Sequence, residues 1–150
     1  MLNAQVKKSI DDSVLCWLAT VDKNKFPNVS PKEVFSCWDD KYIIIANIAS
    51  PESVRNIKNN TSVCVSFIDV LVQKGFKAKG EAQILDNQNP VYEEMKSVLE
   101  KITNGKYPFR EIIAVEVQYV KPIIAPSYSL FPEMTDQQRI DVAKKQYRLR

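Results

Sequence analysis

The sequence contains no histidine, and this absence excludes several kinds of active site at once. Without an imidazole there is no Ser–His–Asp triad, no Cys–His nucleophile pair and no His-ligated zinc or iron. Glycine is also scarce, with only three in 150 residues, so a G-x-G-x-x-G dinucleotide fingerprint cannot be formed. Residues 75–80 have the glycine spacing of a P-loop, but Glu81 and Ala82 follow where Lys and Ser/Thr are needed. A P-loop is therefore excluded as well.

The three cysteines, Cys16, Cys37 and Cys64, are odd in number and far apart, which favours small buried apolar residues over disulfides or a metal site. A net charge of +3 is too small to indicate nucleic-acid binding by itself. No apolar run approaches the length of a membrane span, and the N-terminus has no secretory core, so a cytoplasmic location is expected. The apolar content of 45% and charged content of 26% are typical of one globular domain.

Short apolar or alternating runs separated by polar turns predict six β-strands. Turns this short join antiparallel strands, so a parallel doubly wound sheet is excluded. A mainly β fold is expected, a small closed or split antiparallel barrel with peripheral helices. Pro31 marks an edge or a bulge in the second strand. The small residues of the fifth strand imply close approach by another backbone or a flat ligand. The predicted strands are 14–21, 27–37, 42–48, 62–68, 76–84 and 113–119, the last ended by Pro122 and Pro126.

Four helices are predicted around these strands. Residues 2–10 have apolar residues four apart, and Ser50 followed by Pro51 is typical of an N-cap and first helical residue. The third helix has the clearest 3.6-residue period and ends at Gly105, and a capping box starts the fourth at Thr135. The first strand is apolar on both faces, which indicates a barrel interior on one side and a helix or second subunit on the other.

Three segments could carry chemistry. In 46–53 a helix N-terminus follows a buried strand directly, an arrangement that binds anions, although an ordinary capped helix has the same pattern. Polar groups interrupt a strand at 28–33, as in a ligand site or in an edge strand protected by Pro and Lys. Residues 73–80 are basic and rich in small side chains, which also fits a solvated strand face.

Taken together, these segments resemble the pyridoxamine 5'-phosphate oxidase-like FMN-binding split-barrel family. The resemblance rests on an ordered set of runs over about residues 13–125: LATVD at 18–22, FPNVSPK at 26–32, ANIASP at 46–51, VRNIKNN at 54–60, VCVSF at 63–67 and GFKAKG at 75–80. It implies a single domain, an antiparallel six-stranded split barrel of the FMN-binding type followed by a helical tail over about 126–150. It also implies a homodimer with FMN in clefts at the subunit interface.

Site residues follow from the same resemblance. Ser30, Pro31 and Lys32 would line the flavin ring and ribityl chain, and Asn47, Ile48 and Ala49 would contact the cofactor. Ser53 would meet the phosphate, with Gln73 and Lys74 approaching from the next strand pair. Many relatives carry Arg or Lys where this chain has Pro51, Glu52 and Ser53, and a carboxylate at Glu52 has the wrong sign. Either Lys32, Arg55, Lys74 or Lys79 replaces the missing cation, or FMN affinity is reduced, or the cofactor is lost.

The resemblance implies a flavin-dependent oxidoreductase of unknown substrate, in which FMN transfers hydride or electrons from a donor such as NAD(P)H. Relatives that oxidise pyridoxamine phosphate use additional Arg and His side chains, so vitamin B6 oxidation is not expected here. The alternatives are a non-catalytic flavin-binding or storage module and an apo dimeric barrel. An RNA-binding barrel is disfavoured because Phe76 shares its strand face with Ala78 rather than with Lys77 and Lys79. No nucleic-acid or membrane partner, no metal and no specific catalytic residue are predicted.

Overall fold

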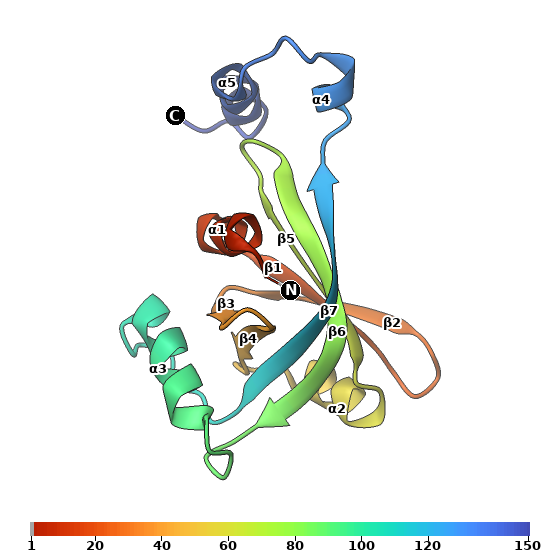
Figure 1. The fold of residues 1–150 in the computed structure, drawn as a ribbon, viewed down its shortest axis with the longest axis vertical. Coiled ribbons are helices and arrows are strands. Elements are labelled where there is room, and N and C mark those ends of the chain that lie inside the picture. Colours follow the sequence, from red (N-terminus) through yellow and green to blue (C-terminus); the bar gives the residue numbers. More distant parts are fainter. Residues whose placement is uncertain (1) are drawn as a thin grey trace.

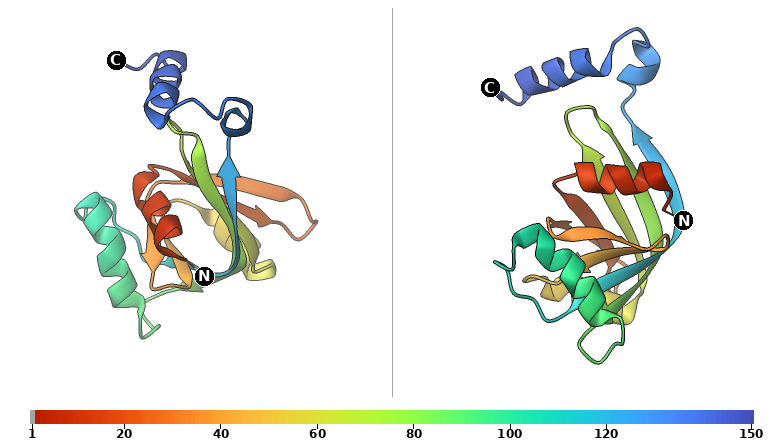
Figure 2. Two further views of the ribbon diagram at one scale, coloured as in Figure 1. Left: turned by 45° about the horizontal axis from the view of Figure 1, so that its top comes forward. Right: turned by 60° about the vertical axis from the view of Figure 1, so that its left-hand side comes forward.

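The computed structural model of the chain describes residues 2–150, in which seven strands form one antiparallel sheet. The strand order is β2-β1-β5-β6-β7-β4-β3, and the sheet curls into a half-barrel (Figures 1 and 2). The predicted antiparallel barrel-like fold is thus confirmed, with one strand more than expected. The strands are β1 (Cys16–Val21), β2 (Pro27–Lys32), β3 (Phe35–Trp38), β4 (Tyr42–Ala46), β5 (Ser62–Asp69), β6 (Lys74–Leu85) and β7 (Ile112–Ile124).

The extra strand arises because the segment predicted as one strand, 27–37, divides into two. β2 and β3 lie at opposite edges of the sheet, and only residues 33–34 separate them along the chain. Pro31 occupies an edge strand as predicted, opposite Trp17. The chain therefore crosses from one edge of the curled sheet to the other at Glu33 and Val34.

β6 and β7 are the longest strands and pair along their whole lengths. The register shifts at Lys79/Gly80, and a Cβ atom on Gly80 would lie 1.9 Å from the backbone oxygen of Glu116. Another backbone, not a ligand, therefore explains this small residue. β7 continues through Pro122, the first of the two prolines expected to end it, which lies opposite Phe76, and it ends at Ile124 before the second. A proline fits here because β4 pairs only with residues 112–116 of β7, so at Pro122 this strand has a partner on one side only.

Helices cover parts of the half-barrel. α1 (Ala4–Asp12) is capped by Asn3 and packs Val6 and Ile10 on the main core, while α3 (Tyr92–Thr103) packs Met95 and Leu99 on a second core. α2 (Pro51–Asn59) begins and ends as predicted, and α5 (Asp136–Gln146) has the predicted capping box. The short α4 (Ser127–Leu130) was not predicted.

Residues 2–150 leave part of the outer face of β1 exposed. Cys16, Leu18 and Thr20 are buried, whereas Trp17 is 43% exposed and Val29 on the neighbouring strand is 56% exposed. The barrel interior expected on one face of β1 is present, whereas Trp17 on the other face is left exposed, so a cover from a second subunit stays a prediction. None of the helices in residues 2–150 is long and apolar enough to cross a membrane. The same residues contain no cluster of three or more His, Cys, Asp and Glu side chains that could hold a metal ion.

Candidate functional site

Two cavities lie on either side of the segment that joins β4 to α2. The Lys32 cavity has a volume of about 290 Å³ and is lined by Pro31, Lys32, Glu33, Val34, Ala46, Ile48 and Tyr107. The Asn47 cavity has a volume of about 610 Å³ and is lined by Asn47, Ala49, Ser50, Pro51, Val54, Arg55, Lys58, Asn59 and Glu111. Alternate residues of the segment face alternate cavities, so one short stretch of backbone contributes to both.

Lys32 is buried at the end of β2, with 6% of its surface exposed. Its Nζ donates hydrogen bonds to the Ser50 Oγ and, at 2.7 Å, to the Ser30 Oγ. No ion pair among residues 2–150 involves Lys32. Burial lowers the pKa of Lys32 because the charged form is poorly solvated, while the neighbouring Cys16 acts in the opposite direction. The structure thus holds an ammonium group among hydroxyls, with no carboxylate to balance its charge.

The N-terminus of α2 lies next to this ammonium. Ser50 occupies the N-cap position as predicted, but its side chain makes no capping bond; its Oγ instead donates to the Ile48 carbonyl at 3.1 Å. The first-turn N–H groups therefore lack a side-chain acceptor, and the positive end of the helix dipole adds to the charge of Lys32. Glu52 is exposed and lines neither cavity, so its carboxylate does not oppose them directly.

The backbone between β4 and α2 is unusual. Ala49 has a φ of 49°, in the left-handed region that non-glycine residues rarely adopt. Beside it, Asn47 donates from Nδ2 to the Glu111 Oε2 at 2.8 Å, but its Oδ1 is buried and has no partner. A buried amide oxygen without a donor carries a desolvation cost that a bound hydroxyl or N–H would remove.

Most of the predicted site residues gather at these cavities. Ser30, Pro31 and Lys32 lie on one side, Asn47 and Ala49 on the other, and Ile48 lines the Lys32 cavity. Arg55 is exposed at the Asn47 cavity beside Lys58, whereas Ser53 is almost fully buried in α2 and lines neither cavity.

Cys16 lies close enough to Lys32 for each charge to affect the other. Burial raises the pKa of the Cys16 thiol to about 12, although the charge of Lys32 acts in the opposite direction. The thiol is therefore protonated near neutral pH and is not a nucleophile.

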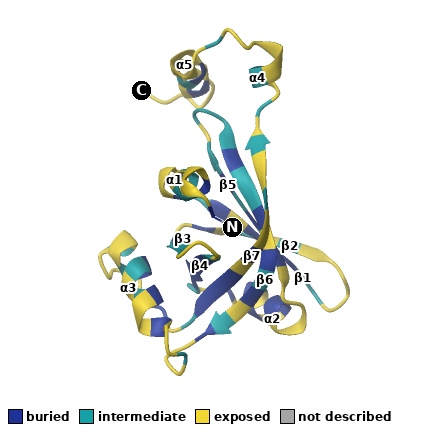
Figure 3. Cartoon of the chain, in the orientation of Figure 1, coloured by how far each residue is buried: buried dark blue, intermediate teal, exposed yellow. Residues whose placement is uncertain are grey.

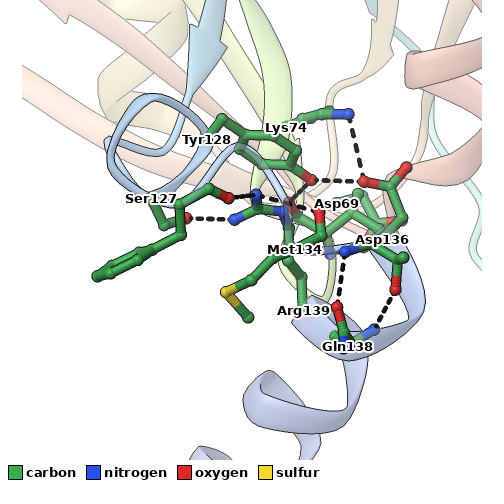
Figure 4. Close-up of polar contacts among 11 residues, drawn as sticks. Asp69, Lys74, Ser127, Tyr128, Met134, Asp136, Gln138 and Arg139 are labelled. Carbon is green, nitrogen blue, oxygen red and sulfur yellow. Dashed lines mark hydrogen bonds and ion pairs between the residues drawn. The ribbon is translucent and has the colours of Figure 1, made fainter.

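Gln73 and Lys74 are not brought to these cavities within one chain. They lie at the turn between β5 and β6, at the end of the half-barrel away from α2 (Figure 1). There the Lys74 Nζ lies 3.5 Å from the Asp136 Oδ1 and 4.1 Å from the centre of the Tyr128 ring (Figure 4). Any role for these two residues beside Lys32 requires a second copy of the chain.

Tyr107 and Glu111 are among the lining residues that were not predicted. Both come from the connection between α3 and β7, which reaches the β4–α2 segment only in the folded chain; the Asn47 N–H also bonds the Glu111 carbonyl at 3.0 Å. No local pattern in the sequence indicates this approach.

Comparisons with known proteins find a family model and several solved structures to which this chain is similar. A family model described as pyridoxamine 5'-phosphate oxidase matches residues 2–123. The solved structure of HupZ from Group A Streptococcus is 26% identical with a TM-score of 0.69, over 80% of this chain and 92% of that chain. An FMN-binding protein from Syntrophomonas wolfei is 19% identical with a TM-score of 0.69, over 83% and 87%. An F420 reductase is 19% identical with a TM-score of 0.61, over 79% and 98%. No curated protein matches the chain.

Proposed function

The chain belongs to the pyridoxamine 5'-phosphate oxidase family, as the sequence runs predicted, and on that premise we propose that it binds FMN between two copies of itself and acts as a flavin-dependent oxidoreductase. Similar folds in an FMN-binding protein and an F420 reductase are consistent with a flavin-type ligand. The substrate is not part of the proposal.

The observation that carries the proposal is the uncompensated charge of Lys32 at the start of α2. A buried ammonium without a carboxylate is costly unless a ligand supplies the opposite charge. A phosphate group would accept bonds from Lys32, from the Ser50 hydroxyl and from the free N–H groups of the first helical turn. This arrangement would replace the basic pair that is missing from the helix start, and Arg55 would add charge at the rim.

The remaining lining fits the rest of the cofactor. Pro31, Ile48 and Tyr107 offer apolar and aromatic surface to a flat ring. The orphaned Oδ1 of Asn47 would accept a hydrogen bond from a ribityl hydroxyl or a ring N–H. The left-handed conformation of Ala49 gives the short segment between the two cavities its shape, and the surrounding structure must hold it there.

A second copy would complete the cleft. Gln73 and Lys74 are too remote to serve the same chain's Lys32 cavity, and Trp17 and Val29 expose apolar surface on the outer face of β1 and β2. A homodimer would bury that surface and bring one chain's β5–β6 turn to the other chain's cavity. FMN would supply hydride or electron transfer with a donor such as NAD(P)H, and the protein would bind and orient it.

Titration of the dialysed protein with FMN and with riboflavin tests the proposal. Flavin fluorescence and absorbance should show FMN bound at least 10-fold more tightly than riboflavin, because only FMN carries the phosphate. Absence of FMN binding, or equal affinity for both, would reject the phosphate site. Anaerobic addition of NAD(P)H to the loaded protein then separates function from storage, because only an oxidoreductase would lose the flavin absorbance at a useful rate.

A further inference from the structure

The last part of the chain forms an arm that lies outside the residues matched by the family model. This C-terminal arm, residues 125–150, contains α4 and α5 and projects away from the half-barrel (Figure 2). It is fixed to the β5–β6 turn: the Tyr128 hydroxyl donates to the Val72 carbonyl at 2.8 Å, and the Ala125 N–H donates to the Gln73 carbonyl at 3.2 Å. The position of the arm is therefore tied to that of the turn.

Arg139 holds the arm together internally. Its guanidinium stacks 3.8 Å from the centre of the Tyr128 ring and donates to the Phe131 carbonyl at 2.8 Å and to the Ser127 hydroxyl at 3.0 Å (Figure 4). Arg139 is buried, and no ion pair among residues 2–150 involves it. The arm is thus a built structural unit, attached to the barrel chiefly at the β5–β6 turn.

The arm nevertheless leaves much of its apolar surface uncovered. It holds five of the fifteen large apolar side chains exposed in residues 2–150, and most of it is coloured as exposed in Figure 3. One third of these exposed side chains therefore lies in the arm, and uncovered apolar surface of this kind is where partners commonly bind. Its last ten residues add four exposed basic side chains and one acidic one, Asp141. The exposed apolar side chains of the arm are Leu130, Phe131, Val142, Tyr147 and Leu149.

A groove of complementary character lies between the C-terminal ends of α1 and α3 and the start of β3. Its volume is about 610 Å³, and it includes the apolar side chains of Val14, Ile102 and Tyr107, which are 82%, 47% and 59% exposed. Asp11 and Glu33 add negative charge to the groove. The C-terminal ends of α1 and α3 add to it, because the helix dipole is negative at that end. Lys106 is the one basic residue in the lining.

We propose that the arm of one copy docks into this groove of a second copy and forms the outer wall of its cofactor cleft. The inference rests on the dimeric flavin site proposed above. The groove is continuous with the Lys32 cavity, because Glu33, Val34 and Tyr107 line both. If Gln73 and Lys74 of one copy reach the other's Lys32 cavity, the attached arm arrives beside the groove. α5 has 11 residues and is about 16 Å long, so the basic residues at its C-terminal end can lie along the groove.

In this docking, the arm of the partner copy would cover the open side of the Lys32 cavity. The Leu149 and Tyr147 side chains would meet the apolar lining, and Arg148 would face the two carboxylates. Bulk water would then be excluded from one face of the bound ring, which strengthens the electrostatic contacts within the cleft.

Chemical crosslinking between different chains tests the docking without relying on flavin. Leu149→Cys and Ile102→Cys, both at exposed positions, are placed in separate chains of different isotopic mass, co-expressed and treated with a short bis-maleimide. Mass spectrometry should find the 149–102 link at least 10-fold more often than in a matched pair with Asn87→Cys, which lies at the opposite end of α3. Wild-type chains control for reaction at the native cysteines.

Two outcomes would overturn the proposal: no interchain link, or a link no more frequent than in the control pair. A third is tested with a chain that carries both substitutions and is expressed alone: if its 149–102 link forms only within one chain, the arm folds onto its own groove and the proposal is wrong. Loss of flavin binding with the link retained would reject the proposed function and leave the docking intact. Flavin binding without the link would reject the docking alone.

Discussion

The ammonium of Lys32 donates a hydrogen bond to the hydroxyl of Ser50, 18 residues further along the chain. This contact ties the end of β2 to the first residue of the α2 region and explains why Ser50 does not cap the helix. It also leaves the Lys32 ammonium next to the free N–H groups of the first turn of α2. Since a buried cation with hydroxyl partners alone is poorly stabilised, the site is suited to an anion.

The affinity for FMN should fall as the pH is raised into the alkaline range. Burial lowers the pKa of Lys32 from its ordinary value of 10.5, so the free site loses its charge at a lower pH than an exposed lysine would. FMN should then bind progressively more weakly through that range, while a Lys32→Arg protein should show little change because arginine stays charged. Titrations with FMN at several pH values measure this affinity. Parallel titrations with riboflavin correct for ionisation of the flavin ring, because both ligands carry that ring. A pH-independent FMN to riboflavin ratio would contradict the role of Lys32.

Without flavin, Lys32→Met should stabilise the fold by roughly 1 kcal/mol at neutral pH, because it removes a buried charge. The unfolded wild-type chain binds more protons at this position than the folded one between the lowered pKa and 10.5. Wild-type stability should therefore rise with pH across that window, and the variant should lack the rise. Urea denaturation at neutral and alkaline pH measures both effects. A variant clearly less stable than wild type would mean that Lys32 is structural.

Gly80→Ala should destabilise the barrel by about 1–3 kcal/mol, because its Cβ would overlap the backbone oxygen of Glu116 across the β6–β7 pair. Gly105→Ala is the matched control, since nothing lies within 4 Å of its Cβ and only its φ of 69° is unfavourable. That substitution should cost about 1 kcal/mol. Thermal or urea denaturation compares the two, and an equal effect would show that β6 and β7 separate easily at the bulge.

Arg139→Met should loosen the arm and leave the barrel unchanged. The substitution removes donors to the Phe131 carbonyl and the Ser127 hydroxyl, and each lost buried bond costs about 1–3 kcal/mol locally. Amide hydrogen exchange in α5 should accelerate 10-fold or more, while β6 and β7 keep their protection. Arg110→Met, at an exposed residue outside the arm, should change neither region. Global loss of protection would show that the arm and barrel unfold together.

The local elements were predictable because their patterns are strong. The Ser50-Pro51 start of α2 and the capping box of α5 appear in the structure where the sequence places them. The division of residues 27–37 was not predictable, since a continued strand and a crossing to the far edge have the same local alternation. Only the closing of the half-barrel, which places β2 and β3 at opposite edges, decides between them.

For the site, the structure brings together Lys32 and the 46–51 segment, both of which the resemblance assigned to the cofactor, but no pattern predicted the contacts between them. Ser50 was expected to cap α2 and instead accepts from Lys32. Glu111 reaches the site through tertiary packing, which no window of sequence describes. The sequence also does not indicate that Arg139 is buried, because a buried arginine without an acidic partner is unusual.

The most direct test of the central claim is the affinity for FMN and riboflavin in wild type, Lys32→Met and the exposed control Lys23→Met. Loss of one charge-assisted contact of about 1.5–3 kcal/mol should weaken FMN binding about 10- to 100-fold in the Lys32 variant. Riboflavin binding should stay the same in all three proteins, and FMN binding should be unchanged in the control. If the Lys32→Met protein binds FMN as tightly as wild type does, or if its affinities for FMN and riboflavin fall by the same factor, Lys32 does not hold the phosphate.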